Sequence, residues 1–99
     1  YQYPHALQRY AEIGRYVGLT GKNDQEVFEK LLVKLDELMR TIEIKPNIKD
    51  YNIDEKNFLD NLDEMSEQAF NDQCTGANPR YPLISEIKEL YLKSYYGDK

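Results

Sequence analysis

The residues with the widest chemical repertoire lie in one short run, residues 72–82, which contains the only cysteine of the chain, a glycine, two prolines and an arginine. The thiol of Cys74 could act as a nucleophile, but a nucleophilic cysteine needs a nearby base that generates the thiolate. The only histidine, His5, lies far away in the sequence, and no neighbouring residue is placed to orient its ring. The pattern therefore favours a small, inert, half-buried thiol over a nucleophile.

Two further sets of residues could in principle bind a metal ion, namely His5 and a row of carboxylates. His5 has no His, Cys or carboxylate at ligand spacing around it, which favours a surface residue at a helix start over a metal ligand. One helix face would carry a row of carboxylates spaced i, i+3, i+4, i+7, namely Asp60, Asp63, Glu64 and Glu67. Hard cations prefer oxygen ligands, but the row lacks the loop of a calcium site. The row is therefore interpreted as a solvated helix face. No metal ligand and no catalytic residue is expected in this chain.

Arg80 and the tyrosines have both a binding and a structural interpretation. Arg80 could bind an anion through its planar donor fork. It could also cap the last carbonyl groups of the preceding helix or pair with Asp72, and these structural roles are favoured. Of the nine tyrosines, Tyr91, Tyr95 and Tyr96 lie near the C-terminus. They could form an aromatic platform, although helical spacing on a terminal helix is more typical of packing with the hydroxyl at the edge.

These residues must be positioned by helices, because apolar residues recur with a helical period and no alternating run of useful length predicts a strand. Helices are expected over residues 4–17, over 23–43, from 54 to the run around Cys74, and from 82 to about 97, with one short turn at 48–51. Gly18 is a plausible C-cap, and Asn23 and Asp54 are plausible N-caps. The predicted fold class is all-α, with about four helices and short connections in a single helical domain over residues 1–99.

Each expected helix also carries an apolar face. The second helix has the clearest stripe: Phe28, Leu31, Leu32, Leu35, Leu38, Met39 and Ile42. The third is expected to bury Phe58, Leu59, Leu62, Met65 and Ala69, and the fourth to turn Ile84, Ile87, Leu90, Tyr91 and Tyr95 inward. This periodicity is typical of amphipathic helices in a folded domain.

The run between the last two helices has no such period, and its composition predicts a stiff, irregular connector. Gly76 can adopt a positive φ without a Cβ clash, and Asn78 tolerates that region better than most residues. Pro79 disfavours a helical Asn78, and Pro82 does the same to Tyr81. Loops of this kind on a rigid scaffold often carry function.

Composition excludes several classes of protein. The chain has 99 residues, 40% hydrophobic and 31% charged, which is typical of a folded domain with a small core. Its net charge of −5 argues against a nucleic-acid surface. No apolar run approaches the roughly 20 residues that span a bilayer, so no membrane partner is expected. A single cysteine without a disulfide partner favours a reducing, cytoplasmic setting.

The residues around Cys74 also resemble a known family. Residues 66–80 read SEQAFNDQCTGANPR, residues 81–86 read YPLISE and residues 95–97 read YYG. This region resembles the C-terminus of iron-containing alcohol dehydrogenases, and in particular the alcohol dehydrogenase half of the bifunctional aldehyde–alcohol dehydrogenases of fermenting bacteria. RYAEI at residues 9–13, followed by Gly18-Leu19, is similar to the same proteins further upstream. The resemblance covers nearly the whole chain.

The resemblance implies roles for three loop residues. The matching cysteine lines the catalytic cleft near the substrate and the nicotinamide without attacking either, so Cys74 is expected to be a contact in the cleft. Thr75 and Gly76 are expected to form the neighbouring wall and backbone. The metal ligands of the family, one Asp and three His, precede this region, and His5 matches none of them.

The resemblance also implies a parent enzyme larger than this chain. It would bind NAD and Fe(II) and would convert acetaldehyde and NADH to ethanol, with a nucleotide-binding domain and metal-ligand helices as partners of this part, in a homo-oligomer. A chain that starts at Tyr1 is expected to be a piece of such a protein. Without metal ligands or a cofactor loop, the piece is expected to be inactive alone and to bind neither cofactor.

A second hypothesis remains open. The apolar stripe of the second helix and the tyrosine-rich last helix would also suit a stand-alone helical module that binds another protein. The loop around Cys74 counts against it, because a bundle connector does not require such a loop.

Overall fold

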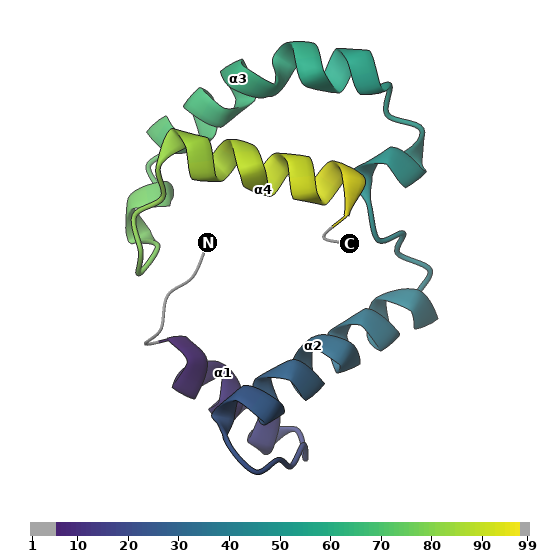
Figure 1. Ribbon diagram of the computed structural model, residues 1–99, viewed down its shortest axis with the longest axis vertical. Coiled ribbons are helices and arrows are strands. Elements are labelled where there is room, and N and C mark those ends of the chain that lie inside the picture. The colour runs from purple at the N-terminus through teal and green to yellow at the C-terminus, as the bar shows by residue number, and fades with distance from the viewer. Residues whose placement is uncertain (1–5, 98–99) are drawn as a thin grey trace. The chain divides into compact units, whose positions relative to one another are not determined.

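The computed structural model describes residues 6–97, and every regular element within them is a helix (Figure 1). The α-helices are α1 (Leu7–Tyr16), α2 (Asp24–Thr41), α3 (Glu55–Asn71) and α4 (Ile84–Tyr96), and the connections contain two 3-10 helices, η2 (Ile48–Tyr51) and η3 (Thr75–Ala77). The prediction of an all-α fold with four helices is confirmed. Pro4 and His5 lie outside the described residues. None of the helices described here is long and apolar enough to cross a membrane.

The starts of α2 and α3 lie where the local sequence predicted them, and the C-terminal ends of α1, α2 and α4 lie within about two residues of the predicted ones. Asn23 caps α2, because its side-chain Oδ1 accepts a hydrogen bond from the Glu26 N–H at 2.9 Å. Asp54 caps α3 in the same way, accepting from the Asn57 N–H at 2.9 Å. The C-cap of α1 is Val17, one residue before the predicted Gly18. Gly18 follows it with a φ of +95°, a conformation that costs a residue with a Cβ more than it costs glycine.

The chain divides into two compact units, whose described parts are residues 6–44 and residues 45–97. We call them the N-terminal unit and the C-terminal unit. The expectation of one single domain over residues 1–99 stays a prediction.

In the N-terminal unit, α1 packs on the first turns of α2 through small side chains. Ala11 and Val27 are fully buried, and Gly14 is buried beside them. A Cβ at Gly14 would lie 2.7 Å from Val27 Cγ1, so the two helices approach closely only because residue 14 has no side chain. Arg15 and Asp24 form an ion pair at 2.7 Å next to this contact.

The buried face of α2 differs from the predicted stripe. Val27, which lay outside the stripe, is buried together with Leu31, and Phe28 and Met39 are half-buried. Four members of the stripe are 47–57% exposed: Leu32, Leu35, Leu38 and Ile42. The reason is length, since α1 has 10 residues and α2 has 18, so the partner helix within this unit covers only the beginning of α2.

In the C-terminal unit, α3 and α4 lie side by side and run in opposite directions (Figure 1). Phe58, Leu62 and Tyr95 form a buried cluster at 3–6% exposure, with Met65 and Tyr91 packed against it. Three residues that were predicted to face inward are instead 40–44% exposed: Leu59, Ile84 and Leu90. A two-helix pair explains this, because each of these helices has one α-helical partner in the unit, besides a short 3-10 helix, and buries only a narrow stripe.

Candidate functional site

The candidate site is the loop that joins α3 to α4, and its first bend is made by Asp72. This residue leaves the helical conformation at the end of α3, with φ −65° and ψ 137°. Its carboxylate accepts a hydrogen bond from the Cys74 N–H at 2.7 Å, and its carbonyl accepts one from the Thr75 N–H at 3.1 Å. A short Asp side chain that bonds to the backbone two residues later forms an Asx turn. The backbone of Cys74 is therefore held by Asp72.

The side chain of Cys74 is exposed, so the prediction of a half-buried thiol is wrong. Cys74 lies beyond the last turn of α3. The loop contacts its flanking helices through Thr75 and Arg80. Gly76 is also exposed and belongs to η3. It does not use the positive φ that a glycine permits, since Gly18 and Gly97 are the glycines with positive φ among residues 6–97.

Thr75 lies between these two residues but faces the protein. Its side chain is half-buried, and its Oγ1–H donates a hydrogen bond to the carbonyl of Ala69 in the last turn of α3. The same carbonyl also accepts a hydrogen bond from the Asp72 N–H at 3.3 Å, so the hydroxyl is a second donor to a carbonyl at the helix C-terminus. Within the predicted triplet, Cys74 and Gly76 are therefore on the surface, while Thr75 attaches the loop to α3.

The second half of the loop is held by Arg80. Its guanidinium forms an ion pair with Glu86 in the first turn of α4. The sequence had suggested two other partners, the last carbonyl groups of the preceding helix and Asp72. Asn78 is extended, with φ −66° and ψ 135°, as Pro79 predicts, and its Oδ1 accepts a hydrogen bond from the Arg80 N–H at 3.1 Å. This half of the loop is thus attached to α4.

The carboxylate of Glu86 has two partners that both favour its charged form. Its Oε2 accepts a hydrogen bond from the Leu83 N–H at 2.8 Å, and its Oε1 faces Arg80. The hydrogen bond from Leu83 and the positive charge of Arg80 lower the pKa of Glu86 below its ordinary value, against the opposing effect of its partial burial. Glu86 is therefore an anion that joins the loop to the helix N-terminus.

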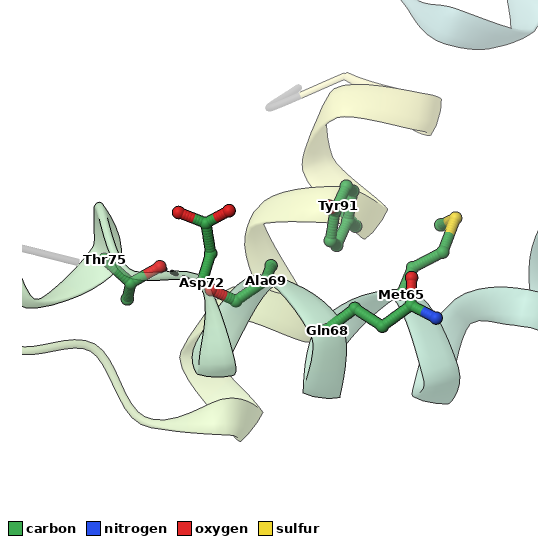
Figure 2. Close-up of a pocket in the computed structure, with 6 residues that line it drawn as sticks. All are labelled: Met65, Gln68, Ala69, Asp72, Thr75 and Tyr91. Atoms are coloured by element: carbon green, nitrogen blue, oxygen red, sulfur yellow. Dashed lines mark hydrogen bonds between the residues drawn. The ribbon is translucent and has the colours of Figure 1, made fainter.

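An open pocket of about 410 Å³ lies beside the loop (Figure 2). It is lined by Met65, Gln68, Ala69, Asp72, Thr75 and Tyr91. Figure 2 shows Asp72 and Thr75 at one end of the pocket and Met65 and Gln68 at the other, with Tyr91 reaching in from α4. Thr75 is the member of the predicted triplet that lines it. The α3 residues Met65, Gln68 and Ala69 were missed as pocket lining, although their spacing is that of one helix face.

The tyrosines at the end of α4 have structural roles. The Tyr95 hydroxyl donates to the Ile53 carbonyl at 2.6 Å, and the Tyr96 hydroxyl donates to Glu55 at 2.6 Å. Burial raises the pKa of Tyr95, and the hydrogen bond to Glu55 raises that of Tyr96. Both therefore attach the end of α4 to the start of α3, as the packing interpretation predicted, whereas Tyr91 lines the pocket.

The described residues do not fit a metal ion. Within residues 6–97, no three His, Cys, Asp or Glu side chains come together as a ligand group. The carboxylate row on α3 is exposed; Asp63 pairs with Lys88 of α4, and Glu64 accepts a hydrogen bond from Gln68 at 3.2 Å. No strand with a glycine-rich turn, the usual dinucleotide-binding unit, occurs in this part of the chain either.

Comparisons with known proteins point to one family. The family model described as Fe-containing alcohol dehydrogenase family, C-terminal, matches residues 1–95. The bifunctional aldehyde-alcohol dehydrogenase of Escherichia coli strain K12 is 48% identical over 99 residues, covering 98% of this chain and 11% of that protein. The aldehyde-alcohol dehydrogenase of Clostridium acetobutylicum is 47% identical over 95 residues, covering 96% and 11%. The NADPH-dependent butanol dehydrogenase of Clostridium saccharobutylicum is 36% identical, covering 93% and 24%. The chain thus spans between about a tenth and a quarter of the length of these relatives.

Proposed function

Because this chain belongs to the Fe-containing alcohol dehydrogenase family and matches its C-terminal part, we propose that it is the C-terminal helical part of an alcohol dehydrogenase and forms one wall of the catalytic cleft. The match over residues 1–95 carries this proposal. The loop after α3 supports it, because the loop is attached to both flanking helices and still leaves Cys74 and Gly76 on the surface.

We assign Cys74, Thr75 and Gly76 to the wall of the substrate and cofactor cleft. The exposed thiol of Cys74 would contact bound substrate, and Gly76 would allow close approach of the backbone. No bond is made or broken by these residues. Thr75 contributes by holding the turn, since its hydroxyl is already used by the Ala69 carbonyl.

The reaction we propose for the whole enzyme is the reduction of acetaldehyde to ethanol by NADH, with Fe(II) as the metal. Two relatives that are 47–48% identical carry both the aldehyde and the alcohol activity in their names, which supports this substrate class. The relative from Clostridium saccharobutylicum is named for NADPH, so the choice of nicotinamide cofactor needs its own measurement. The described residues offer no ligand set for the metal, so the remainder of the enzyme would hold it.

The partners of this chain would be the remainder of that enzyme, namely a nucleotide-binding domain and the helices that carry the metal ligands, in a homo-oligomer. The chain by itself would then be inactive. The 47–57% exposure of four aliphatic residues on α2 agrees with a surface that other parts of an enzyme cover.

A hybrid enzyme tests the proposal. The segment of the Escherichia coli bifunctional enzyme that matches this chain is replaced by the 99 residues, and acetaldehyde-dependent NADH oxidation is measured anaerobically with added Fe(II). The matched controls are the unmodified enzyme, the enzyme lacking the segment, and the 99-residue chain alone. We expect activity in the hybrid and in the unmodified enzyme only. A folded, metal-loaded hybrid without turnover, or turnover by the chain alone, would contradict the proposal.

The exposed apolar residues of α2 and its C-cap also favour a second candidate, a stand-alone helical module that binds a partner through Leu32, Leu35, Leu38 and Ile42. An apolar stripe on an exposed helix face is a common way to bind another helix. Size-exclusion chromatography with light scattering tests whether this face binds a second copy of the chain. A stable monomer whose Leu35→Glu variant behaves identically would argue against such self-association.

A further inference from the structure

A continuous series of hydrogen bonds crosses the loop from α4 to α3. Glu86 in α4 pairs with the guanidinium of Arg80, and the Arg80 N–H donates to Asn78 Oδ1 at 3.1 Å. The Asn78 N–H donates to the Thr75 carbonyl at 3.2 Å, and the Thr75 hydroxyl donates to the Ala69 carbonyl in α3. Every step lies within the C-terminal unit. The loop is therefore attached to one helix at each end. Thr75 takes part in both attachments, because its carbonyl accepts from Asn78 and its hydroxyl donates to Ala69.

The residues on either side of Thr75 have a different character. Cys74 and Gly76 are exposed, and Gly76 would admit a methyl group, whose nearest neighbour would be Tyr81 Cε2 at 3.8 Å. Tyr81 in turn packs its ring edge-on against Phe70 of α3, with ring centroids 5.5 Å apart. The two exposed residues thus depend for their position on neighbours that are attached to the helices.

We propose that Thr75, Arg80 and Glu86 are positioning residues, which hold the loop so that Cys74 and Gly76 are presented to the cleft in one conformation. The existence of a cleft beside Cys74 and Gly76 rests on the proposed function, whereas the attachment of the loop to α3 and α4 does not. Preorganised contacts matter in an active site because a wall that moves by about 1 Å can reduce the rate strongly. Loss of any one step of the series should loosen the loop without unfolding the helices.

Two variants with matched controls test the attachment. Thr75→Val keeps the shape of the side chain and removes the hydroxyl; its control is Thr41→Val, which removes a similar bond to the Glu37 carbonyl at the end of α2. Glu86→Gln removes the charge opposite Arg80; its control is Glu89→Gln, which breaks an exposed ion pair with Lys93 on the same helix. Arg80→Lys keeps the positive charge but lacks the planar donor fork, so it should preserve the attachment of the loop to α4 only in part.

The first readout is amide hydrogen exchange of residues 74–80, which reports local opening. Each bond of this kind contributes on the order of 1 kcal/mol, which corresponds to roughly fivefold faster exchange in the Thr75 variant. A similar direction is expected for Glu86→Gln, with α3 and α4 unchanged and with neither control affecting the loop. Loop exchange that is equal in variants and controls would overturn the proposal. It is measured in the 99-residue chain and in the hybrid enzyme, so a variant that fails to fold alone is still examined.

The second readout separates positioning from simple stability. In an active hybrid, the Thr75 and Glu86 variants should raise the KM for acetaldehyde more than they lower kcat, whereas the two controls leave both unchanged. Faster loop exchange with an unchanged KM would overturn the positioning role. A hybrid that is inactive with the unchanged 99 residues would instead contradict the proposed function, while the exchange data would still decide whether the loop is held by these three residues.

Discussion

The ring of Tyr95 near the end of α4 stacks on the ring of Phe58 near the start of α3, with centroids 4.4 Å apart and planes 16° from parallel. Both residues are buried, at 4% and 6% exposure. The hydroxyl of Tyr95 reaches the carbonyl of Ile53 ahead of α3. This contact closes the α3–α4 pair at the end opposite the Cys74 loop.

Truncation of the stack should destabilise the C-terminal unit. Phe58→Ala removes a buried ring and leaves a cavity against Tyr95, and such changes cost about 3 kcal/mol or more of the free energy of unfolding. Urea unfolding followed by far-UV circular dichroism measures this. The control is the neighbouring Leu59→Ala, which is 43% exposed and should cost less than about 1 kcal/mol. Equal losses in the two variants would contradict the observed core.

A methyl group should destabilise the protein at one glycine and have no effect on stability at another. Gly14→Ala places a Cβ 2.7 Å from Val27 Cγ1, which forces α1 and α2 apart and should cost about 1–3 kcal/mol of the free energy of unfolding. Gly76→Ala meets nothing closer than 3.8 Å and should leave the unfolding transition unchanged. Thermal unfolding of both variants and of the wild type measures the two effects on stability. If Gly76→Ala folds normally but lowers the activity of the hybrid, the loss reflects the cleft and not the fold.

Acid should weaken the attachment of the loop. The pKa of Glu86 is lowered by the Leu83 N–H and by Arg80, so the native state holds its carboxylate charged at a pH where the unfolded chain has bound a proton. The stabilisation is complete above the ordinary glutamate pKa of about 4.3 and is lost as the pH falls through the lower pKa of the folded state.

A pH series of unfolding measurements checks this sign. The wild type should be more stable than Glu86→Gln above about pH 5, and the two should converge as the pH falls through the range where Glu86 is protonated. An advantage that grows as the pH falls would contradict the assigned ion pair. Glu89→Gln, which affects only an exposed pair, serves as the control.

The thiol of Cys74 should react readily in the folded 99-residue chain. The side chain is exposed, and the backbone N–H rather than the sulfur is engaged with Asp72. A colorimetric disulfide reagent should therefore modify one thiol per chain at a rate close to that in denaturant. Strong protection in the native chain would contradict the exposed position. In the hybrid enzyme, protection by bound nicotinamide cofactor would be expected if Cys74 lies in the cleft.

Local signals predicted much of this fold. Asn23 and Asp54 cap helices as expected, because an N-cap depends on a side chain and a backbone N–H only three residues away. The short turn at residues 48–51 is η2, and Asn78 is extended before Pro79 for a steric reason that is equally local. The residues around Cys74 also carried the family resemblance, which the family match bears out.

The sequence by itself thus determined the helices, their ends and the family. Tertiary structure decided which part of each helix is buried, which residues line the pocket, and that Arg80 pairs with Glu86. Periodicity shows which residues share a helix face, but the extent of that face that is covered depends on the length and direction of the partner helix. Val27 was missed because its burial also depends on the partner helix. The absent side chain of Gly14 lets α1 approach Val27, and the distance between the two helices is set by their packing.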